Sequence, residues 1–147
     1  MSLRLLLALL VSLATPLRAQ SVEARLDGFA ANPAAIQAGA GLMFVTGTYL
    51  RSGIAAGIGA SQHGFSGRVD FVNRFHLDPF GEHRWAPYGG GGLTTRLDAN
   101  RKTRFYLLVL AGLDGPARNG IITSVEAGLG GGGRVGVIIR RAPAKGR

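Results

Sequence analysis

The chain has 147 residues and no cysteine, which fits one domain and excludes a disulfide framework and thiolate metal sites. Its 24 glycines follow no period of three, which excludes collagen, and no excess of Ser, Pro or Gln accompanies them as disorder would require. The formal charge is +9, but the basic residues are dispersed except at the C-terminus, so we expect no nucleic-acid partner.

The first residues have the pattern of a secretory signal peptide. Arg4 supplies a positive start, residues 5–14 are apolar, and Ala19 offers a small residue at the cleavage position. The apolar run is too short for a spanning helix, and an uncleaved anchor is the alternative. We therefore predict export. The predicted organisation is a signal peptide at 1–19, a β-barrel domain at 20–141 and a short basic tail at 142–147.

The remaining chain divides into stretches in which apolar and polar side chains alternate. Because side chains of a β-strand alternate between its two faces, each stretch is predicted as a strand with one apolar face. No later segment has helical periodicity, so we expect an all-β meander, sandwich or barrel. In chain order, the predicted strands cover residues 21–29, 36–44, 49–60, 65–76, 85–98, 104–111, 121–129 and 134–140.

Turn signals separate these predicted strands. The clearest are 78–83, which contains Asp-Pro and Gly, and 114–120, which contains Asp-Gly-Pro and Asn-Gly. Shorter polar or glycine-rich turns are predicted at 30–33, 62–64 and 99–102, and Gly130–Gly133 is predicted as the last turn. The spacing therefore predicts eight antiparallel strands joined in sequence order.

The polar faces of these strands carry charges of both signs. An eight-stranded barrel has a narrow interior, so charges that face inward must pair with one another. Glycine shares this face in four strands, and its lack of a side chain leaves room for arginine to cross. We predict a lumen ion network made of Glu23, Arg25, Asp27, Arg51, Arg68, Asp70, Arg74, Arg96, Asp98, Glu126, Arg134 and Arg140.

Two barrels fit this alternation. An even number of strands near ten residues long, with almost no charge on the apolar face, is typical of a transmembrane β-barrel. A soluble periplasmic barrel of the lipocalin type, binding an apolar ligand, would exchange the two faces. The positive mean hydropathy of +0.20 favours the membrane barrel. In a soluble barrel the many Ala and Gly residues at apolar positions would face inward and would pack only a thin core, which also favours the membrane barrel.

Two glycine-rich stretches carry a family resemblance. Residues 86–93 (APYGGGGL) and 125–137 (VEAGLGGGGRVGV) resemble strands of small bacterial outer-membrane β-barrel proteins of the eight-stranded up-and-down type. The resemblance implies the outer membrane of a Gram-negative bacterium, both termini in the periplasm, and short periplasmic turns. It also implies outer-membrane lipid and the barrel-insertion machinery as partners. On this topology 78–83 is periplasmic and 100–102 is extracellular.

The histidines and the glycine runs are the candidate sites of chemistry in this sequence. His63 lies near Ser61 and Ser66 at a predicted rim, which leaves a lipid A-modifying membrane enzyme as a second alternative. No acid accompanies them, and a histidine in a turn is usually solvated. His76 continues the charged face and is expected to join the Arg68, Asp70 and Arg74 group, while His83 lies in a turn.

No metal or cofactor site is predicted. The histidines lack metal-ligand spacing, and neither GGGG run precedes a helix or carries the Lys-Ser/Thr of a phosphate loop. Trp85, Tyr88 and Tyr49 lie near predicted strand ends, where aromatic side chains either form an interfacial belt or pack ordinarily. The expected function is therefore a non-catalytic outer-membrane barrel with a structural or membrane-integrity role.

Overall fold

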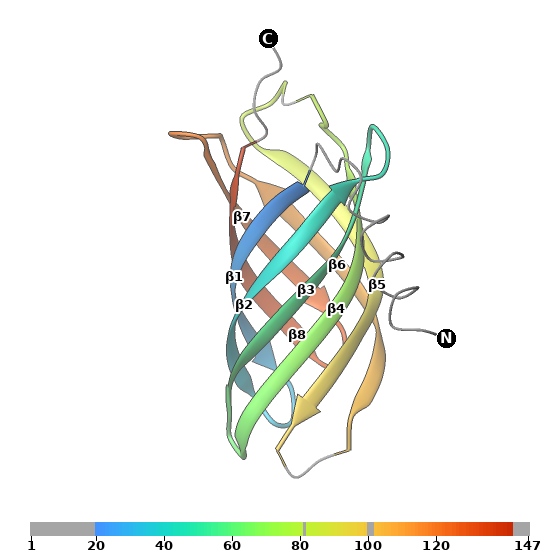
Figure 1. The fold of residues 1–147 in the computed structure, drawn as a ribbon, viewed down its shortest axis with the longest axis vertical. Helices are drawn as coiled ribbons and strands as arrows, with labels where there is room; N and C mark the ends of the chain where they lie inside the picture. Colours follow the sequence, from blue (N-terminus) through green and yellow to red (C-terminus); the bar gives the residue numbers. More distant parts are fainter. Residues whose placement is uncertain (1–19, 81, 100–101, 143–147) are drawn as a thin grey trace, which may run out of the picture.

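Eight strands close into a barrel in which each strand is antiparallel to its neighbours in sequence, and β1 also pairs with β8 (Figure 1). The computed structural model describes residues 20–80, 82–99 and 102–142, so the predicted signal peptide at 1–19 and residues 143–147 of the predicted tail lie outside the described residues. The predicted eight-stranded antiparallel barrel is confirmed. Its strands are β1 (Gln20–Ala30), β2 (Ala35–Val45), β3 (Leu50–Ser61), β4 (Gly64–His76), β5 (Ala86–Asp98), β6 (Arg104–Asp114), β7 (Ile121–Leu129) and β8 (Gly133–Arg141).

The two faces of the barrel wall have opposite chemistry. Along β4, Arg68 and Asp70 point inward and are 1% and 0% exposed, whereas Phe71, which follows Asp70, points outward and is 51% exposed. On β6, Phe105 and Leu107 point outward and are 75% and 78% exposed. Because the side-chain period of a strand is two, the alternation in the sequence converts directly into a charged interior and an apolar exterior.

The interior also holds a small apolar cluster beside the charges. Its members are buried side chains from β2, β4, β5 and β6: Met43, Val72, Tyr88, Leu108 and Leu110. Glycines make room for the charged groups. A Cβ at Gly57 would lie 3.3 Å from Nη2 of Arg68, and a Cβ at Gly136 would collide with the Asp27 carboxylate. Inward glycines therefore set the space in which long charged side chains cross the barrel.

Both described termini lie at one end of the barrel, which we call the terminal end; the opposite end is the far end (Figure 1). The connections at the terminal end are 46–49, 77–85 and 115–120, and those at the far end are 31–34, 62–63, 99–103 and 130–132. The longest connection therefore lies at the terminal end, unlike the short turns there that the family resemblance implied. The described part of the chain contains no helix with the length and hydropathy needed to span a membrane.

Candidate functional site in the charged interior of the barrel

Glu126 on β7 is the centre of the interior network. Its carboxylate accepts hydrogen bonds from Arg25 at 2.7 Å, from Arg134 at 2.9 Å and from the Tyr88 hydroxyl at 3.1 Å. Nη2 of Arg74 lies 2.9 Å from the same carboxylate. Glu126 is 1% exposed, so these contacts replace water almost completely. Three guanidinium groups from β1, β4 and β8 therefore converge on one buried carboxylate.

The carboxylates of β1 continue the network on either side of Glu126. Glu23 accepts a hydrogen bond from Arg74 at 2.7 Å, and Asp27 accepts one from Arg68 at 2.6 Å. Asp27 also lies 3.3 Å from Nε of Arg25, its neighbour on the same face. Since Arg74 and Arg68 belong to β4, these pairs cross the interior and join opposite walls of the barrel.

Asp70 on β4 completes the central part of the network. Its carboxylate accepts a hydrogen bond from Arg134 at 2.7 Å and lies 3.4 Å from Nη1 of Arg68. These side chains are at most 2% exposed. A buried charge that loses its partner destabilises a protein strongly, because no water is present to replace the lost contact. The network therefore holds the walls together only while its arginines and carboxylates remain matched.

A second group surrounds Asp114 near the terminal end. Asp114 accepts a hydrogen bond from the Ser124 hydroxyl at 2.7 Å and pairs with Arg140, and Nδ1 of His76 lies 3.4 Å away. Arg140 also lies 3.6 Å from Glu23, which links this group to the central network. His76 faces inward as expected, but its ion-pair partner is Asp114. The chain of contacts through Arg140 and Glu23 connects it to Arg74.

Asp114 itself was missed by sequence reasoning, which placed it in the turn 114–120. The structure extends β6 to Asp114, which is 7% exposed and faces inward. The parity shared with Leu108, Leu110 and Gly112 was the signal that could have found it. The Asp-Gly-Pro turn signal masked that parity, because aspartate often begins a turn.

A third group occupies the far end. Arg96 lies 3.3 Å from Asp98, which accepts a hydrogen bond from the Ser66 hydroxyl at 2.8 Å. Ser66 in turn accepts one from the amide of Gln37 at 2.8 Å. The Arg96 guanidinium lies 5.4 Å from the centre of the Phe29 ring, a cation–π distance. The far end therefore holds mixed polar contacts with fewer ion pairs than the centre.

All residues of the predicted network except Arg51 form ion pairs within the described part of the chain. Arg51 is half-buried at the start of β3, and no carboxylate of the described residues lies within ion-pair distance. Tyr88 points inward to Glu126 and is 2% exposed, so it belongs to no outer aromatic belt.

The structure does not assemble His63, Ser61 and Ser66 into a catalytic arrangement. The backbone N–H of His63 donates to the Ser61 hydroxyl at 3.3 Å, while the side chain of Ser66 is buried inside the barrel and donates to Asp98. Among the described residues, no hydrogen bond joins the His63 imidazole to either serine. These residues therefore serve turn geometry and interior packing.

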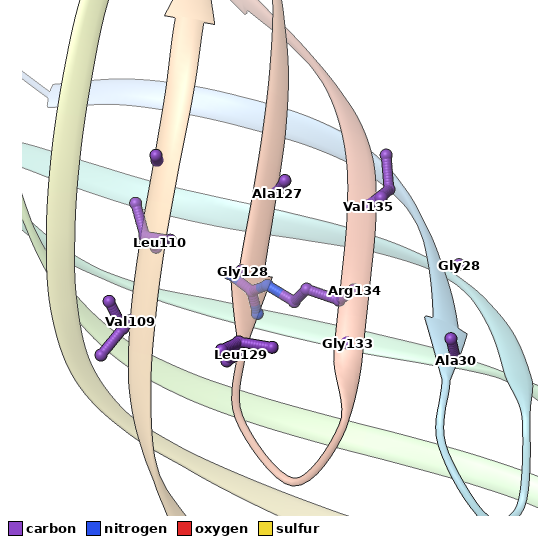
Figure 2. A pocket seen from close by; sticks show the side chains of 11 residues that line it. Gly28, Ala30, Val109, Leu110, Ala127, Gly128, Leu129, Gly133, Arg134 and Val135 are labelled. Carbon is purple, nitrogen blue, oxygen red and sulfur yellow. The ribbon is translucent and has the colours of Figure 1, made fainter.

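The apolar outer wall carries a groove of about 470 Å³ across β6, β7, β8 and β1. Small residues such as Gly28, Ala127 and Gly133 form much of its lining. Figure 2 shows Arg134 extending from β8 past Gly128, its pairing partner on β7. The groove therefore exists because these wall positions carry small side chains, and Gly128 also leaves room for Arg134 to extend toward Glu126.

Comparisons with known proteins identify similar folds but no related family. No protein-family model and no curated protein matches the chain. Among solved structures, the chain is similar to the N-terminal β-barrel domain of OprF from Pseudomonas aeruginosa. The similarity has a TM-score of 0.63 at 12% identity, and it covers 83% of this chain and 95% of that domain. At this identity it establishes the fold alone, and it confirms at that level the predicted resemblance to small eight-stranded barrels.

Proposed function

We propose that this chain is an exported outer-membrane β-barrel with a structural or membrane-integrity role and no catalysis. The observation that carries the proposal is the inverted polarity of the wall. Large apolar side chains such as Ile36, Ile58 and Leu129 are 66–67% exposed on the outside, while charged side chains fill the inside. A soluble monomer rarely exposes an apolar patch of more than a few hundred Å². Lipid is the solvent that matches this exterior.

The filled interior favours a structural role over transport. Ion pairs between opposite walls, such as Arg74 with Glu23 and Arg68 with Asp27, occupy the space through which a solute would pass. We expect at most a narrow ion path through the barrel. The similarity to the OprF barrel supports the architecture of the proposal. Outer-membrane lipid and the barrel-insertion machinery are the proposed partners, with the terminal end in the periplasm.

The two alternatives have less support. A soluble periplasmic barrel that binds an apolar ligand requires an apolar interior, which is the reverse of the arrangement around Glu126. A lipid A-modifying enzyme using His63 requires an activated nucleophile, and the imidazole of His63 reaches neither nearby serine in the described residues.

Heat modifiability combined with fractionation tests the location. Outer membranes are extracted with detergent, and the protein is run on a denaturing gel with and without boiling. We expect the protein in the outer-membrane fraction, with different mobility before and after boiling, because a closed barrel resists the detergent when cold. A protein released with the soluble periplasm and showing no shift would overturn the proposal.

A charge placed on the outer wall tests the same proposal in vitro. Val109 lies at the middle of β6 and is 63% exposed. In lipid vesicles, Val109→Lys should destabilise the barrel by about 2–4 kcal/mol, the cost of a lysine near the bilayer centre. Val109→Leu is the matched control and should fold like the wild type. Equal stability of Val109→Lys and the control would indicate that water, not lipid, covers this face.

A further inference from the structure

A second groove lies at the terminal end, between the connection 77–85 and the turn between β6 and β7. It has a volume of about 470 Å³. Its polar side is formed by Arg84, Arg118 and Asn119, and its apolar side by Trp85, Ile121 and Val125. The groove therefore joins two cationic side chains to the outer apolar wall of β7.

The β6–β7 turn holds Arg118 in a fixed position. Backbone hydrogen bonds run in both directions between Arg118 and Ile121, each at 2.9 Å. Between them, Asn119 and Gly120 have φ of 50° and 75°, the positive values of a type I′ turn. Arg118 and Ile121 form an isolated antiparallel bridge across this turn, the pairing that a type I′ turn favours. Arg118 is consequently presented from a preformed support.

Gly115 brings Trp85 against the same turn. A Cβ at Gly115 would lie 3.3 Å from the Trp85 ring, so the ring packs on the glycine backbone. The N–H of Gly115 donates to the carbonyl of Thr123 at 2.8 Å, which fixes the glycine to β7. Trp85 is 53% exposed, and an indole at the junction of polar and apolar surface is typical of a membrane interface.

The two arginines of the groove have no carboxylate partner among the described residues. Arg84 and Arg118 are exposed, and neither forms an ion pair with a carboxylate of the described residues. Within residues 20–80, 82–99 and 102–142, no carboxylate lines the groove. Below the arginines, Ile121 and Val125 are 46% and 49% exposed. A ligand that satisfies both parts needs an anionic head and an apolar chain.

We propose that this groove binds an anionic phospholipid. The phosphate lies between Arg84 and Arg118, Trp85 lies beside the headgroup region, and an acyl chain follows Ile121 and Val125 along β7. Arginine matches phosphate oxygens through its planar set of donors, and each basic residue near a membrane surface strengthens binding of anionic lipid. The inference rests on the proposed membrane location, and it adds a specific lipid contact to that proposal.

The single tryptophan of the chain is the probe, because Trp85 itself lines the groove. The full-length chain is folded into phosphatidylcholine vesicles that contain an equal fraction of brominated phosphatidylglycerol or brominated phosphatidylcholine. Bromine quenches tryptophan fluorescence on contact. We expect brominated phosphatidylglycerol to compete for the groove about fivefold or more better than brominated phosphatidylcholine, since each arginine contributes about fivefold.

Charge variants separate the groove from general attraction to anionic lipid. Arg84→Gln combined with Arg118→Gln should remove the preference. Lys102→Gln combined with Arg104→Gln is the matched control, because it removes the same charge from exposed residues at the far end. The control should keep the preference. Heat modifiability on gels verifies that both variants fold.

The remaining outcomes separate the two proposals. Equal quenching of the wild type by both brominated lipids would overturn the lipid site and leave the membrane location standing. Preference that survives in the Arg84/Arg118 variant, or that falls equally in the control, would also overturn the site. Absence of quenching by either lipid would overturn the membrane location and the site together.

Discussion

Glu126 in the barrel interior and Asp78 in the β4–β5 connection are both carboxylates that accept several hydrogen bonds. Glu126 receives them from side chains on β1, β4, β5 and β8 and is 1% exposed. Asp78 receives them from the backbone N–H groups of Glu82 at 3.0 Å and His83 at 2.7 Å. The contacts of Glu126 span the barrel, whereas those of Asp78 span five residues.

The comparison shows that the number of hydrogen bonds to a carboxylate does not decide how much they contribute to the free energy of unfolding. The contacts of Asp78 lie in a surface connection, where its own side chain is 9% exposed and the adjoining His83 side chain is 76% exposed, so water reaches them more readily than the interior. Water cannot easily replace the contacts of Glu126, whose loss would leave Arg25, Arg74 and Arg134 buried with unmatched charge. Stability should therefore depend on Glu126 far more than on Asp78.

The largest effect is expected for Glu126→Gln. The amide keeps the shape of the side chain but removes the charge shared by three guanidinium groups, and breaking a buried ion pair costs about 3–5 kcal/mol. Urea unfolding of the refolded barrel in vesicles measures this loss. Glu82→Gln is the matched control, since Glu82 is exposed in the β4–β5 connection. Similar midpoints for the two variants would contradict the central role of Glu126.

A smaller loss, about 2–3 kcal/mol, is expected for Asp70→Ala. Asp70 binds Arg134 at 2.7 Å and lies near Arg68, but Arg134 keeps Glu126 and Arg68 keeps Asp27 as partners. The denaturation midpoint measures the loss. Combining Asp70→Ala with Arg134→Gln should cost less than the sum of the two changes, because the residues share one contact. An unchanged midpoint for Asp70→Ala would reject its placement in the network.

Gly112→Ala should lower the free energy of unfolding by about 1–3 kcal/mol, the cost of adding a group to an interior that is already packed. In Gly112→Ala the new Cβ would collide with the Tyr88 ring, whose hydroxyl donates to Glu126. The matched control is Gly89→Ala, where the nearest atom to the new Cβ is 3.9 Å away. The midpoint should fall for Gly112→Ala and stay within experimental error for Gly89→Ala. Equal midpoints would indicate that Tyr88 has room to move.

Sequence alternation was enough to predict the strands and their inward faces. Arg68, Asp70 and Arg74 lie on one parity of a strand, so their common direction follows from local geometry alone. Counting the alternating stretches gave eight strands, and this number predicted the barrel. Local pattern fixes these features because neighbouring residues determine which face a side chain occupies.

The pairing inside the barrel was beyond local reasoning. Arg25 binds Glu126 across 101 residues of sequence, and this contact exists only because β1, β7 and β8 are neighbours after the barrel closes. Asp114 was assigned to a turn because of its Asp-Gly-Pro signal, and Arg51 shares the inward parity of β3 but forms no ion pair with a carboxylate of the described residues. Local pattern predicts a face, while register and closure decide the partner.

The smallest effect is expected for Asp78→Asn. Hydrogen bonds from the N–H groups of His83 and Glu82 lower the pKa of Asp78 below its ordinary value of 3.8. A lowered pKa in the folded state means that these contacts stabilise the protein above the ordinary pKa, and that the gain is lost as the pH falls through the lowered value. The wild type should therefore unfold at slightly higher urea than Asp78→Asn near neutral pH, and the two midpoints should converge in acid. A loss as large as that of Glu126→Gln, or a gap that widens in acid, would mean that the β4–β5 connection is shielded from water like the interior and would remove the contrast between the two carboxylates.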